Sequence, residues 1–330
     1  MSSTPKSMNM IQAINLALDH AMEQDPTVLV LGEDIADKQG GGVFKCTAGL
    51  SAKYGTERVK STPIAEQAIM GAAVGAALGG MRPVAEIMLM NFMTVGMDQL
   101  VNHAAKLRFM TGGQTHVPLT VRTATGAGFG TGGQHADYLE SWFAHTAGIK
   151  VVAPSTPADA YGLMLSCIFD DDPCLFIENL PLYFVAGAAP VPGARVPIGK
   201  AKVVREGRDV TVISYSRTML EVLAVADELA KRDISVEVID LRSVSPLDMD
   251  TLRASVAKTR RAVVAHEAQV DFGVGAEIAT RLHQDLFGQL LAPVGRVGAT
   301  RSPVPFSKAL ESAYLPTPER ISAAILQTLA

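Results

Sequence analysis

Cysteine is scarce in this sequence, and its placement excludes the chemistry that clustered thiols support. The 330 residues include 3 cysteines, Cys46, Cys167 and Cys174, and none forms a CxxC pair or a spacing typical of a zinc site. An odd and sparse cysteine count argues against a disulfide scaffold and is typical of a reducing compartment.

An excess of charge of one sign is also missing. The chain carries 29 Lys and Arg against 33 Asp and Glu, and the basic residues are scattered, which argues against nucleic-acid binding and a polybasic membrane patch. The most apolar window, residues 64–81, is interrupted by Glu66 and Gln67 and is too broken for a membrane span. Since the N-terminus, MSSTPKSMNM, has no apolar signal core, we expect a soluble cytoplasmic protein.

Several familiar catalytic motifs are absent from the sequence. There is no G-x-x-x-x-G-K-[ST] phosphate loop, no G-x-S-x-G and no H-E-x-x-H. The stretch DDDP at 170–173 lacks EF-hand spacing, and turn chemistry explains it as well as cation binding does. A chain with none of these complete sites is interpreted as contributing one part of a shared site.

What is present is a regular alternation of helical and strand patterns. Apolar residues make up 48% of the chain and charged residues 19%, which allows a large core. The expected helices include residues 10–24 and a long helix over 91–110. Between the helices lie short apolar runs, as in parallel sheets covered on both faces: VLVLGE, VPLTVRT, CLFIEN and SVEVIDL.

A segment rich in proline and glycine divides this alternation. Residues 186–198, AGAAPVPGARVPI, show little periodicity and form the best linker candidate. We therefore expect a first α/β domain over 1–185, a linker over 186–199, and a second, smaller α/β domain over 200–330.

One apolar helical pattern carries a single ionisable side chain. In STPIAEQAIMGAAVGAALGG, residues 61–80, Thr62 and Pro63 fit an N-cap and a first helical position, which places Glu66 in the first turn. Glycines at 71, 75 and 79 share one face and would permit close packing against another helix, either within the chain or across a subunit interface. A carboxyl group near such a dry seam is a candidate proton donor, and stabilisation by the helix dipole explains it equally well.

The segment GAGFGTGGQH, residues 126–135, is a second candidate. It matches G-x-G-x-x-G, but no helix opens there and the next strand pattern, IKVVAPS, does not end in an acid. We therefore reject a nicotinamide site and interpret the segment as flexible backbone that presents Gln134 and His135. A lone histidine is more often structural, yet an exposed imidazole next to such a loop suits proton transfer.

Three stretches together make the chain recognisable. STPIAEQAIMGAAVGAALGGMRPVAEI, NFMTVGMDQLVNHAAKLRFMTGGQ and GGQHADYLESWFAHTAGIKVVAP closely resemble the beta subunit of thiamine-diphosphate-dependent 2-oxo acid dehydrogenases. The resemblance continues to PVPFSKALESAYLP and covers essentially the whole chain. It implies a transketolase-like α/β fold, in which a pyrimidine-binding domain precedes a transketolase C-terminal-type domain, each with a parallel or mostly parallel sheet.

The resemblance also implies that the active site is shared. An alpha subunit would carry the GDG motif that holds the diphosphate and Mg²⁺, and no GDG occurs here. The family assembles as an α2β2 heterotetramer and transfers an acyl group to lipoamide on a dihydrolipoyl acyltransferase core. Glu66 aligns with the acid that hydrogen-bonds the aminopyrimidine of thiamine diphosphate, which favours the imino tautomer and formation of the ylid.

Further residues receive roles from the same resemblance. Ile64, Met88 and Phe92 match positions that line the pyrimidine pocket, although ordinary core packing also explains apolar residues. His135 matches a loop histidine near the thiazolium that serves the substrate or acyl transfer to lipoamide.

A structural monovalent cation, often potassium, is a further implication of the resemblance. Its position here corresponds to the carbonyl groups of Leu119, Cys167 and Ile168, with Asp170 and Asp172. Asp172 departs from the asparagine of the pyruvate members, which weakens the match.

The substrate is less sharply indicated than the family. NFMTVGMDQ and RFMTGGQ resemble pyruvate and acetoin members more than branched-chain members, and we expect pyruvate. SPVPFSKALESAYLP is closer to acetoin members, so acetoin is the first alternative and a branched-chain 2-oxo acid the second. A hypothesis of a different class is a mainly structural subunit that docks the complex on its acyltransferase core through the C-terminal domain.

Overall fold

The structure is a computed structural model that describes residues 7–330. Contacts within the chain divide it into two compact units, Met1–Thr125 with Trp142–Ile198, and Gly126–Ser141 with Gly199–Ala330. Residues 1–6, which open the polar N-terminal stretch, lie outside the described part. No helix within residues 7–330 is long and apolar enough to cross a membrane.

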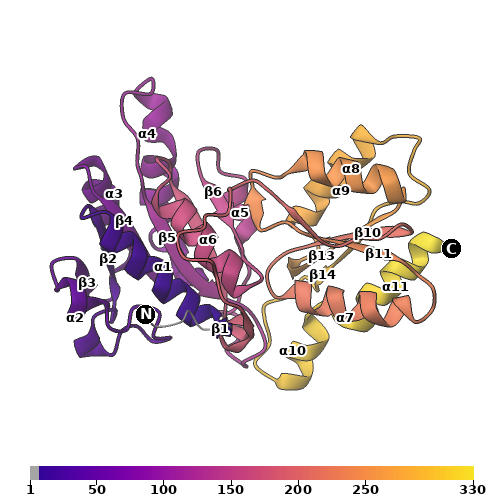
Figure 1. Cartoon of the computed structure of the whole chain (residues 1–330), viewed down its shortest axis with the longest axis horizontal. Helices are drawn as coiled ribbons and strands as arrows, with labels where there is room; N and C mark the ends of the chain where they lie inside the picture. The colour runs from indigo at the N-terminus through magenta and orange to yellow at the C-terminus, as the bar shows by residue number, and fades with distance from the viewer. Residues whose placement is uncertain (1–6) are drawn as a thin grey trace. The chain divides into compact units, whose positions relative to one another are not determined.

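The first unit is built on a parallel sheet with strand order β6-β7-β5-β4-β2-β3 (Figure 1). Its strands are β2 Val28–Glu33, β3 Val59–Thr62, β4 Arg82–Leu89, β5 Thr120–Thr125, β6 Lys150–Val152 and β7 Cys174–Asn179. Every neighbouring pair is parallel, so the strands end at one edge, which we call the carboxyl edge. The continuous apolar runs of the sequence reflect this burial on both faces of the sheet.

Helix α1, Met10–Gln24, begins at a capping box in which the side chains of Asn9 and Gln12 each accept a hydrogen bond from the other's backbone N–H. It packs along α6, Pro157–Ile168, and the two helices form the main core cluster with the sheet. The other helical segments of this unit are η1 Asp37–Gln39, α2 Leu50–Tyr54, α3 Glu66–Leu78, η2 Met90–Thr94, the π-helical η3 Gln99–Ala104, α4 Ala105–Met110 and η4 Leu180–Phe184. Helix α5, Glu140–Ala144, begins in the second unit and ends in the first.

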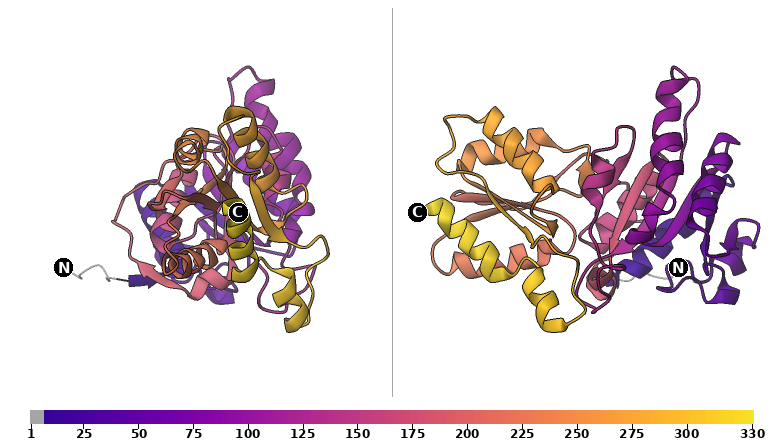
Figure 2. Two further views of the ribbon diagram at one scale, coloured as in Figure 1. Left: turned by 90° about the vertical axis from the view of Figure 1, so that its right-hand side faces the viewer. Right: turned by 180° about the vertical axis from the view of Figure 1, so that it is seen from behind.

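The second unit has a mostly parallel sheet with strand order β14-β13-β10-β11-β9, in which β9 is antiparallel to β11. Helices α7 and α11 cover one face and α8 and α9 the other, and the view from behind shows the same layers (Figures 1 and 2). The elements are β9 Lys202–Arg205, β10 Val210–Ser214, α7 Thr218–Ala230, β11 Val236–Asp240, β12 Ser243–Ser245, α8 Met249–Thr259, β13 Ala262–Gln269, α9 Val274–Asp285, β14 Gly295–Ala299, α10 Lys308–Tyr314 and α11 Pro318–Leu329. Both sheets therefore have the expected α/β character.

Two predictions of local structure were wrong. Thr62 is not a helix N-cap, because it pairs with Glu33 in the parallel ladder of β3 and β2, and α3 begins four residues later at Glu66. The long helix over 91–110 is broken into η2, η3 and α4. Between η2 and η3 the backbone passes close to α3, since a Cβ on Gly96 would lie 2.6 Å from the Met70 Cγ. This tertiary contact interrupts the helical pattern.

The division into units differs in two details from a single cut in the expected linker. Ala186–Ala188 form strand β8, which pairs antiparallel with β1, Ser7–Asn9, and so belongs to the first unit. Residues 126–141, which include His135, belong to the second unit. Contacts distant in sequence, described below, hold them there.

Candidate active site

Four of the expected site residues lie at the carboxyl edge of the first sheet. Ile64 lies in the connection after β3, and Glu66 is the first residue of α3. Met88 is near the end of β4, and Phe92 lies in η2 directly after it. Strand β2 lies between β3 and β4, so two interstrand spacings, about 10 Å in all, separate the two chain segments. Ligands of open α/β sheets bind outside this edge.

The surface properties of these side chains fit an aminopyrimidine ring. Ile64 is 75% exposed, whereas Glu66, Met88 and Phe92 are half-buried. An exposed aliphatic side chain beside a carboxyl group offers apolar wall and hydrogen-bonding group together, the combination that small-molecule sites use. These residues could hold the ring, and Glu66 is the member of the set that can hydrogen-bond a ring nitrogen.

A second acid at this edge was missed by the sequence analysis. Glu33 ends β2, the strand between β3 and β4. Burial raises the pKa of Glu33, and the neighbouring carboxyl groups of Asp34 and Glu66 raise it further. The signal was available, because VLVLGE ends in an acid where a parallel strand meets its carboxyl edge. A carboxyl group that is buried beside other carboxyl groups is harder to ionise, so Glu33 holds its proton more tightly than an exposed glutamate does.

Charged residues inside the sheet form a buried group that we call the Arg122 network. Arg122 on β5 donates to both carboxylate oxygens of Glu178 on β7, each at 2.7 Å, and is also paired with Glu86 on β4. The hydroxyl of Tyr183 donates to Glu178. The three charged residues are at most 7% exposed, and burial raises the pKa of Glu86. The network fixes three neighbouring strands below the carboxyl edge.

Helix α3 is incompletely covered by this chain. A Cβ on Gly75 would meet nothing within 4 Å, and on Gly71 it would meet the Gln99 Cγ at 3.7 Å. Leu78, on the same helix, is 49% exposed. The close contact predicted for the glycine face is therefore not made by the described residues, and the face stays open for another chain. At its first turn α3 is held more tightly, because a Cβ on Gly96 would lie 3.1 Å from the Glu66 carbonyl oxygen.

His135 belongs to the second unit, and Glu66 to the first. The histidine is half-buried; its backbone N–H donates to the Gly132 carbonyl at 3.2 Å, and its Nδ1 lies 3.3 Å from the Thr131 carbonyl oxygen. Because a carbonyl only accepts, this contact favours a proton on Nδ1 and leaves the lone pair on Nε2. The preceding segment, interpreted above as flexible backbone, is anchored by hydrogen bonds.

A buried polar cluster lies in the same unit. Burial raises the pKa of Glu140 to about 7, and Tyr215 donates to one of its oxygens at 2.7 Å. The Tyr215 ring stacks on His266, with centroids 6.1 Å apart, and burial lowers the pKa of His266 to about 4. No sequence motif pointed to this cluster, because its members come from three distant segments.

The residues expected to hold potassium make contacts with the chain's own cations. The Lys150 ammonium lies 2.6 Å from both carboxylate oxygens of Asp170. Arg82 donates to the carbonyl oxygens of Ile168 and Asp170 at 3.3 and 3.0 Å. Oxygen ligands suit a hard cation, but Lys150 and Arg82 already supply positive charge at this corner.

The remaining members of that set are engaged as well. Asp172 pairs with Arg108, and the carbonyl groups of Leu119 and Cys167 accept backbone N–H groups at 2.9 and 3.1 Å. Within residues 7–330 no three His, Cys, Asp or Glu side chains are grouped so that they could hold a metal ion. Potassium binding stays a prediction. Thermal unfolding in potassium chloride and in choline chloride of equal ionic strength tests it, and a rise in Tm specific to potassium would support it.

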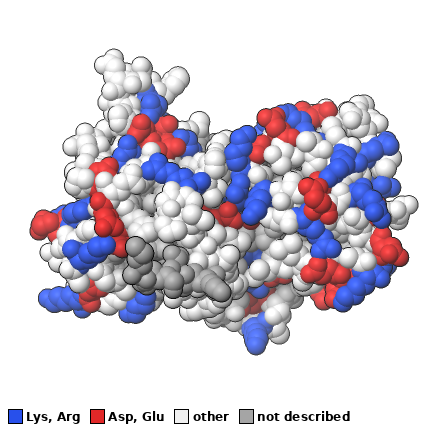
Figure 3. Space-filling model, in the orientation of Figure 1, with Lys and Arg blue, Asp and Glu red and all other residues white. Residues whose placement is uncertain are grey.

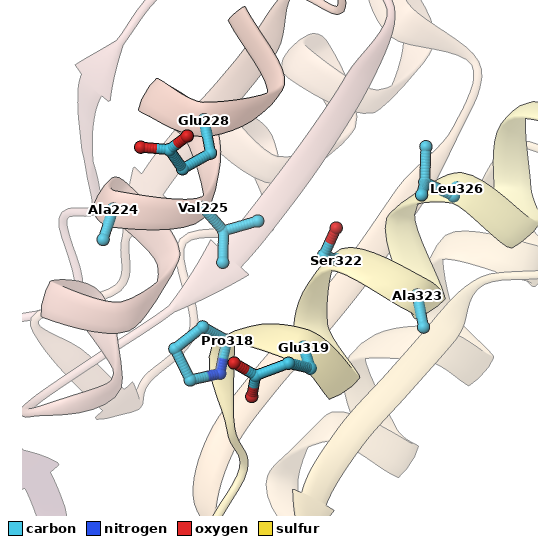
Figure 4. Close-up of a pocket in the computed structure, with 8 residues that line it drawn as sticks. All are labelled: Ala224, Val225, Glu228, Pro318, Glu319, Ser322, Ala323 and Leu326. Atoms are coloured by element: carbon cyan, nitrogen blue, oxygen red, sulfur yellow. The ribbon is translucent and has the colours of Figure 1, made fainter. Parts of the chain in front are cut away.

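An apolar groove of about 450 Å³ lies between α7 and α11 (Figure 4). Its walls include Val225, Pro318 and Leu326, and its charged groups are the carboxylates of Glu228 and Glu319. The lining holds no imidazole, thiol or basic group, so it suits contact rather than catalysis. On the face drawn in Figure 3, acidic and basic side chains are interspersed.

Comparisons with known proteins match both units. Residues 6–184 match the family described as "Transketolase, pyrimidine binding domain", and residues 199–321 match "Transketolase, C-terminal domain". A solved "Split gene transketolase, inactive beta4 tetramer" shares the fold, with a TM-score of 0.80 over 98% of each chain at 22% identity.

Curated relatives are more similar still. The chain is 43% identical over 325 residues to the acetoin:2,6-dichlorophenolindophenol oxidoreductase subunit beta of Cupriavidus necator, covering 96% of both chains. It is 45% identical to a pyruvate dehydrogenase E1 component subunit beta of Staphylococcus epidermidis, covering 95% of this chain and 96% of that one. It is 44% identical to a 3-methyl-2-oxobutanoate dehydrogenase subunit beta of Mycobacterium tuberculosis, covering 97% and 92%.

These matches and the two domain families identify the family of the chain. A pyrimidine-binding domain implies binding of thiamine diphosphate, and a beta subunit implies an alpha-subunit partner. The chain belongs to the transketolase-like beta subunits of the thiamine-diphosphate-dependent E1 components of 2-oxo acid and acetoin dehydrogenases.

Proposed function

We propose that this chain is the beta subunit of a pyruvate dehydrogenase that decarboxylates its substrate oxidatively and passes the acyl group to lipoamide. The observation that carries the proposal is the placement of Glu66 at the start of α3, with Ile64, Met88 and Phe92 on the neighbouring segments of the carboxyl edge. This set supplies an acid and apolar walls for the pyrimidine half of the cofactor.

Thiamine diphosphate, when bound, supplies a nucleophilic carbon and an electron sink for cleaving the bond next to a carbonyl group. Glu66 donates its proton toward a nitrogen of the aminopyrimidine ring. The apolar side chains exclude water from that hydrogen bond, and Glu33, whose pKa is raised first by burial, is a second acid at the same edge. General acid assistance of this kind contributes about 10² to 10⁴-fold to a rate.

The other half of the site comes from the partner. In this proposal the alpha subunit holds the diphosphate and Mg²⁺ within an α2β2 heterotetramer, and the open glycine face of α3 lies against another subunit. His135 acts on the substrate or on acyl transfer to the lipoyl group of a dihydrolipoyl acyltransferase core. Its Nε2 lone pair, left by the Nδ1 contact to the Thr131 carbonyl, is suited to either role.

Turnover with an artificial electron acceptor tests the proposal. The chain is co-expressed with the neighbouring alpha-subunit candidate and assayed with thiamine diphosphate, Mg²⁺ and pyruvate, acetoin or 3-methyl-2-oxobutanoate. Activity should require both chains and should fall at least about 100-fold in Glu66→Gln. Glu57→Gln is the matched control, since the Glu57 side chain is 92% exposed, and it should behave as wild type. Near wild-type turnover of Glu66→Gln would refute the role of Glu66.

Acetoin is the second candidate substrate. The Cupriavidus necator relative, 43% identical over nearly the whole chain, bears the acetoin name, and the identities do not separate it from the pyruvate and branched-chain relatives. Cleavage of acetoin releases acetaldehyde and no carbon dioxide. The three substrates are therefore distinguished by rate and by whether carbon dioxide appears.

The groove between α7 and α11 favours a different class of function, a mainly docking subunit. The two proposals are separable, because Glu66→Gln should abolish turnover and leave assembly with the alpha subunit and the acyltransferase intact. Loss of assembly in the groove variant Ala323→Asp, which changes an exposed residue of the lining, with turnover of the free heterotetramer unchanged, would assign docking to the groove.

A further inference from the structure

The glycine-rich stretch ahead of His135, residues 126–134, is held by buried carboxylates from elements far away in the sequence. We call it the glycine segment. Glu267 on β13 accepts the backbone N–H of Ala127 at 2.7 Å. Glu311 on α10 accepts the N–H of Gly128 at 2.7 Å and that of Gly130 at 3.2 and 3.1 Å through its two oxygens. Both acids are at most 4% exposed, and all these residues belong to the second unit.

The glycine segment needs such anchors because its own conformation is permissive. Four of its glycines have positive φ, with values of +120°, +125°, +67° and +72° at positions 126, 128, 130 and 132. Glycine pays a large entropic cost when it is fixed, so backbone of this kind stays ordered only where other groups hold it. Hydrogen bonds to an ionised carboxylate are about twice as strong as neutral ones. Glu311, which receives two N–H groups, is therefore the principal anchor of the segment's centre.

Residues 303–311 of the second unit pack directly against the glycine segment. A Cβ on Gly132 would lie 2.4 Å from the Phe306 ring, and a Cβ on Gly130 would lie 3.2 Å from the Phe306 carbonyl oxygen. On the other side, Arg217 donates to the Ala127 carbonyl at 2.9 Å. The backbone thus lies directly on residues 303–311, and Glu311 completes this contact with hydrogen bonds.

His135 inherits its position from this arrangement. Its backbone N–H donates to the Gly132 carbonyl, and its Nδ1 contacts the Thr131 carbonyl. The position of the imidazole therefore depends on the position of the end of the glycine segment. A shift of the segment would move the ring with it. Misplacement of a reacting group by about 1 Å can cost roughly 100-fold in rate.

We propose that Glu311 is a positioning residue, whose carboxylate fixes the glycine segment and through it places the imidazole of His135. The inference rests on the proposed function, in which His135 serves the substrate or acyl transfer. Glu311 itself touches neither cofactor nor substrate in this account. Its contribution is to accept the backbone N–H groups of Gly128 and Gly130.

The test uses the heterotetramer with two assays, turnover with an artificial electron acceptor and acylation of a lipoylated domain followed by mass spectrometry. His135→Ala identifies which assay depends on the histidine. Glu311→Gln keeps the side chain's shape but turns an amide toward the N–H donors. It should lower the same assay roughly 10- to 100-fold and leave the affinity for thiamine diphosphate unchanged. Glu277→Gln, an exposed acid of the same unit, is the matched control.

The double variant decides between positioning and a merely structural role. If Glu311 acts through His135, the double variant Glu311→Gln/His135→Ala should be no slower than His135→Ala. Independent effects that multiply, or a Glu311→Gln enzyme equal to wild type while His135→Ala is impaired, would overturn the proposal. No effect of His135→Ala in either assay would instead refute the proposed role of the histidine.

A second variant covers the case in which Glu311→Gln does not assemble. Glu311→Asp retains the charge and withdraws the carboxylate by one methylene. It should show a smaller loss in the assay that depends on His135, again without an additional effect in the His135→Ala background. If Glu311→Asp lowers the activity of the His135→Ala enzyme as strongly as it lowers that of wild type, the proposal is overturned.

Discussion

Replacing Arg122 with methionine should destabilise the first unit severely. Arg122 is 3% exposed and its guanidinium serves Glu178 and Glu86, which are 0% and 7% exposed. Methionine keeps much of the apolar stem but leaves two buried carboxyl groups without their cation. Removing one partner of a buried ion pair costs about 3–5 kcal/mol. At roughly 2–4 °C per kcal/mol for a unit of this size, the Tm should fall by roughly 10 °C.

The loss of stability caused by Arg122→Met should be smaller at low pH than at high pH. Burial already raises the pKa of Glu86, while Arg122 opposes that shift. Without Arg122 the folded-state pKa rises further above the unfolded value of about 4.3. A raised carboxyl pKa stabilises the fold below the unfolded pKa, and this contribution is lost as the pH rises through the folded value. Arg122→Met should therefore be closer to wild type at pH 5 than at pH 8.

Thermal unfolding followed by circular dichroism at both pH values provides the measurement. The matched control is Arg253→Met: Arg253 is a 40% exposed side chain that pairs with Asp250 and Asp285, and its replacement should leave the Tm nearly unchanged, because exposed ion pairs contribute little to stability. The neutral triple variant, with glutamine at 86 and 178 and methionine at 122, should recover much of the loss. A deficit no larger than that of the control, or one that does not shrink at pH 5, would refute this reasoning.

Three further predictions concern helix α3 and the buried cluster of the second unit. Gly96→Ala should weaken thiamine diphosphate binding, measured by calorimetry, because its Cβ would lie 2.6 Å from the Met70 Cγ and 3.1 Å from the carbonyl oxygen of Glu66 in the first turn of α3. In the isolated chain Gly75→Ala meets nothing within 4 Å, so thermal unfolding should show a helix that is more stable by about 0.5–1 kcal/mol. Burial raises the pKa of Glu140 from 4.5 to about 7, so wild type should lose about 3 kcal/mol between pH 4.5 and pH 8 through this group. Glu140→Gln, which still accepts from Tyr215, should remove that part of the pH dependence of unfolding, and an unchanged slope would contradict the assignment.

The carboxyl edge shows where local sequence patterns succeed and where they stop. Continuous apolar runs predicted a parallel sheet covered on both faces, and the helix over 10–24 has the predicted bounds. Glu33 was missed although it ends the strand VLVLGE. Its importance follows from strand order, which places β2 between β3 and β4, and no spacing along the chain encodes that order.

Two other features were decided by contacts that are distant in sequence. The helical pattern over 91–110 is broken where Gly96 passes close to Met70, because tertiary packing outweighs helix propensity of a few tenths of a kcal/mol per residue. The glycine segment looked flexible because glycine permits many conformations, yet Glu267 and Glu311, 140 and 183 residues away, fix its N–H groups.

By itself the sequence determined the alternation of helices and strands, the parallel sheets that this alternation builds, and the family that the motifs resemble. These follow from the period of burial along the chain and from residue identity at matched positions. The tertiary structure alone decided that Glu66, the first residue of α3, lies near Glu33. It also decided that His135 follows a segment whose backbone is held by hydrogen bonds to Glu311. The order of strands in the sheet and the packing of loops bring such residues together. The free energy of both comes from contacts between residues that are far apart in the sequence, which local sequence patterns do not encode.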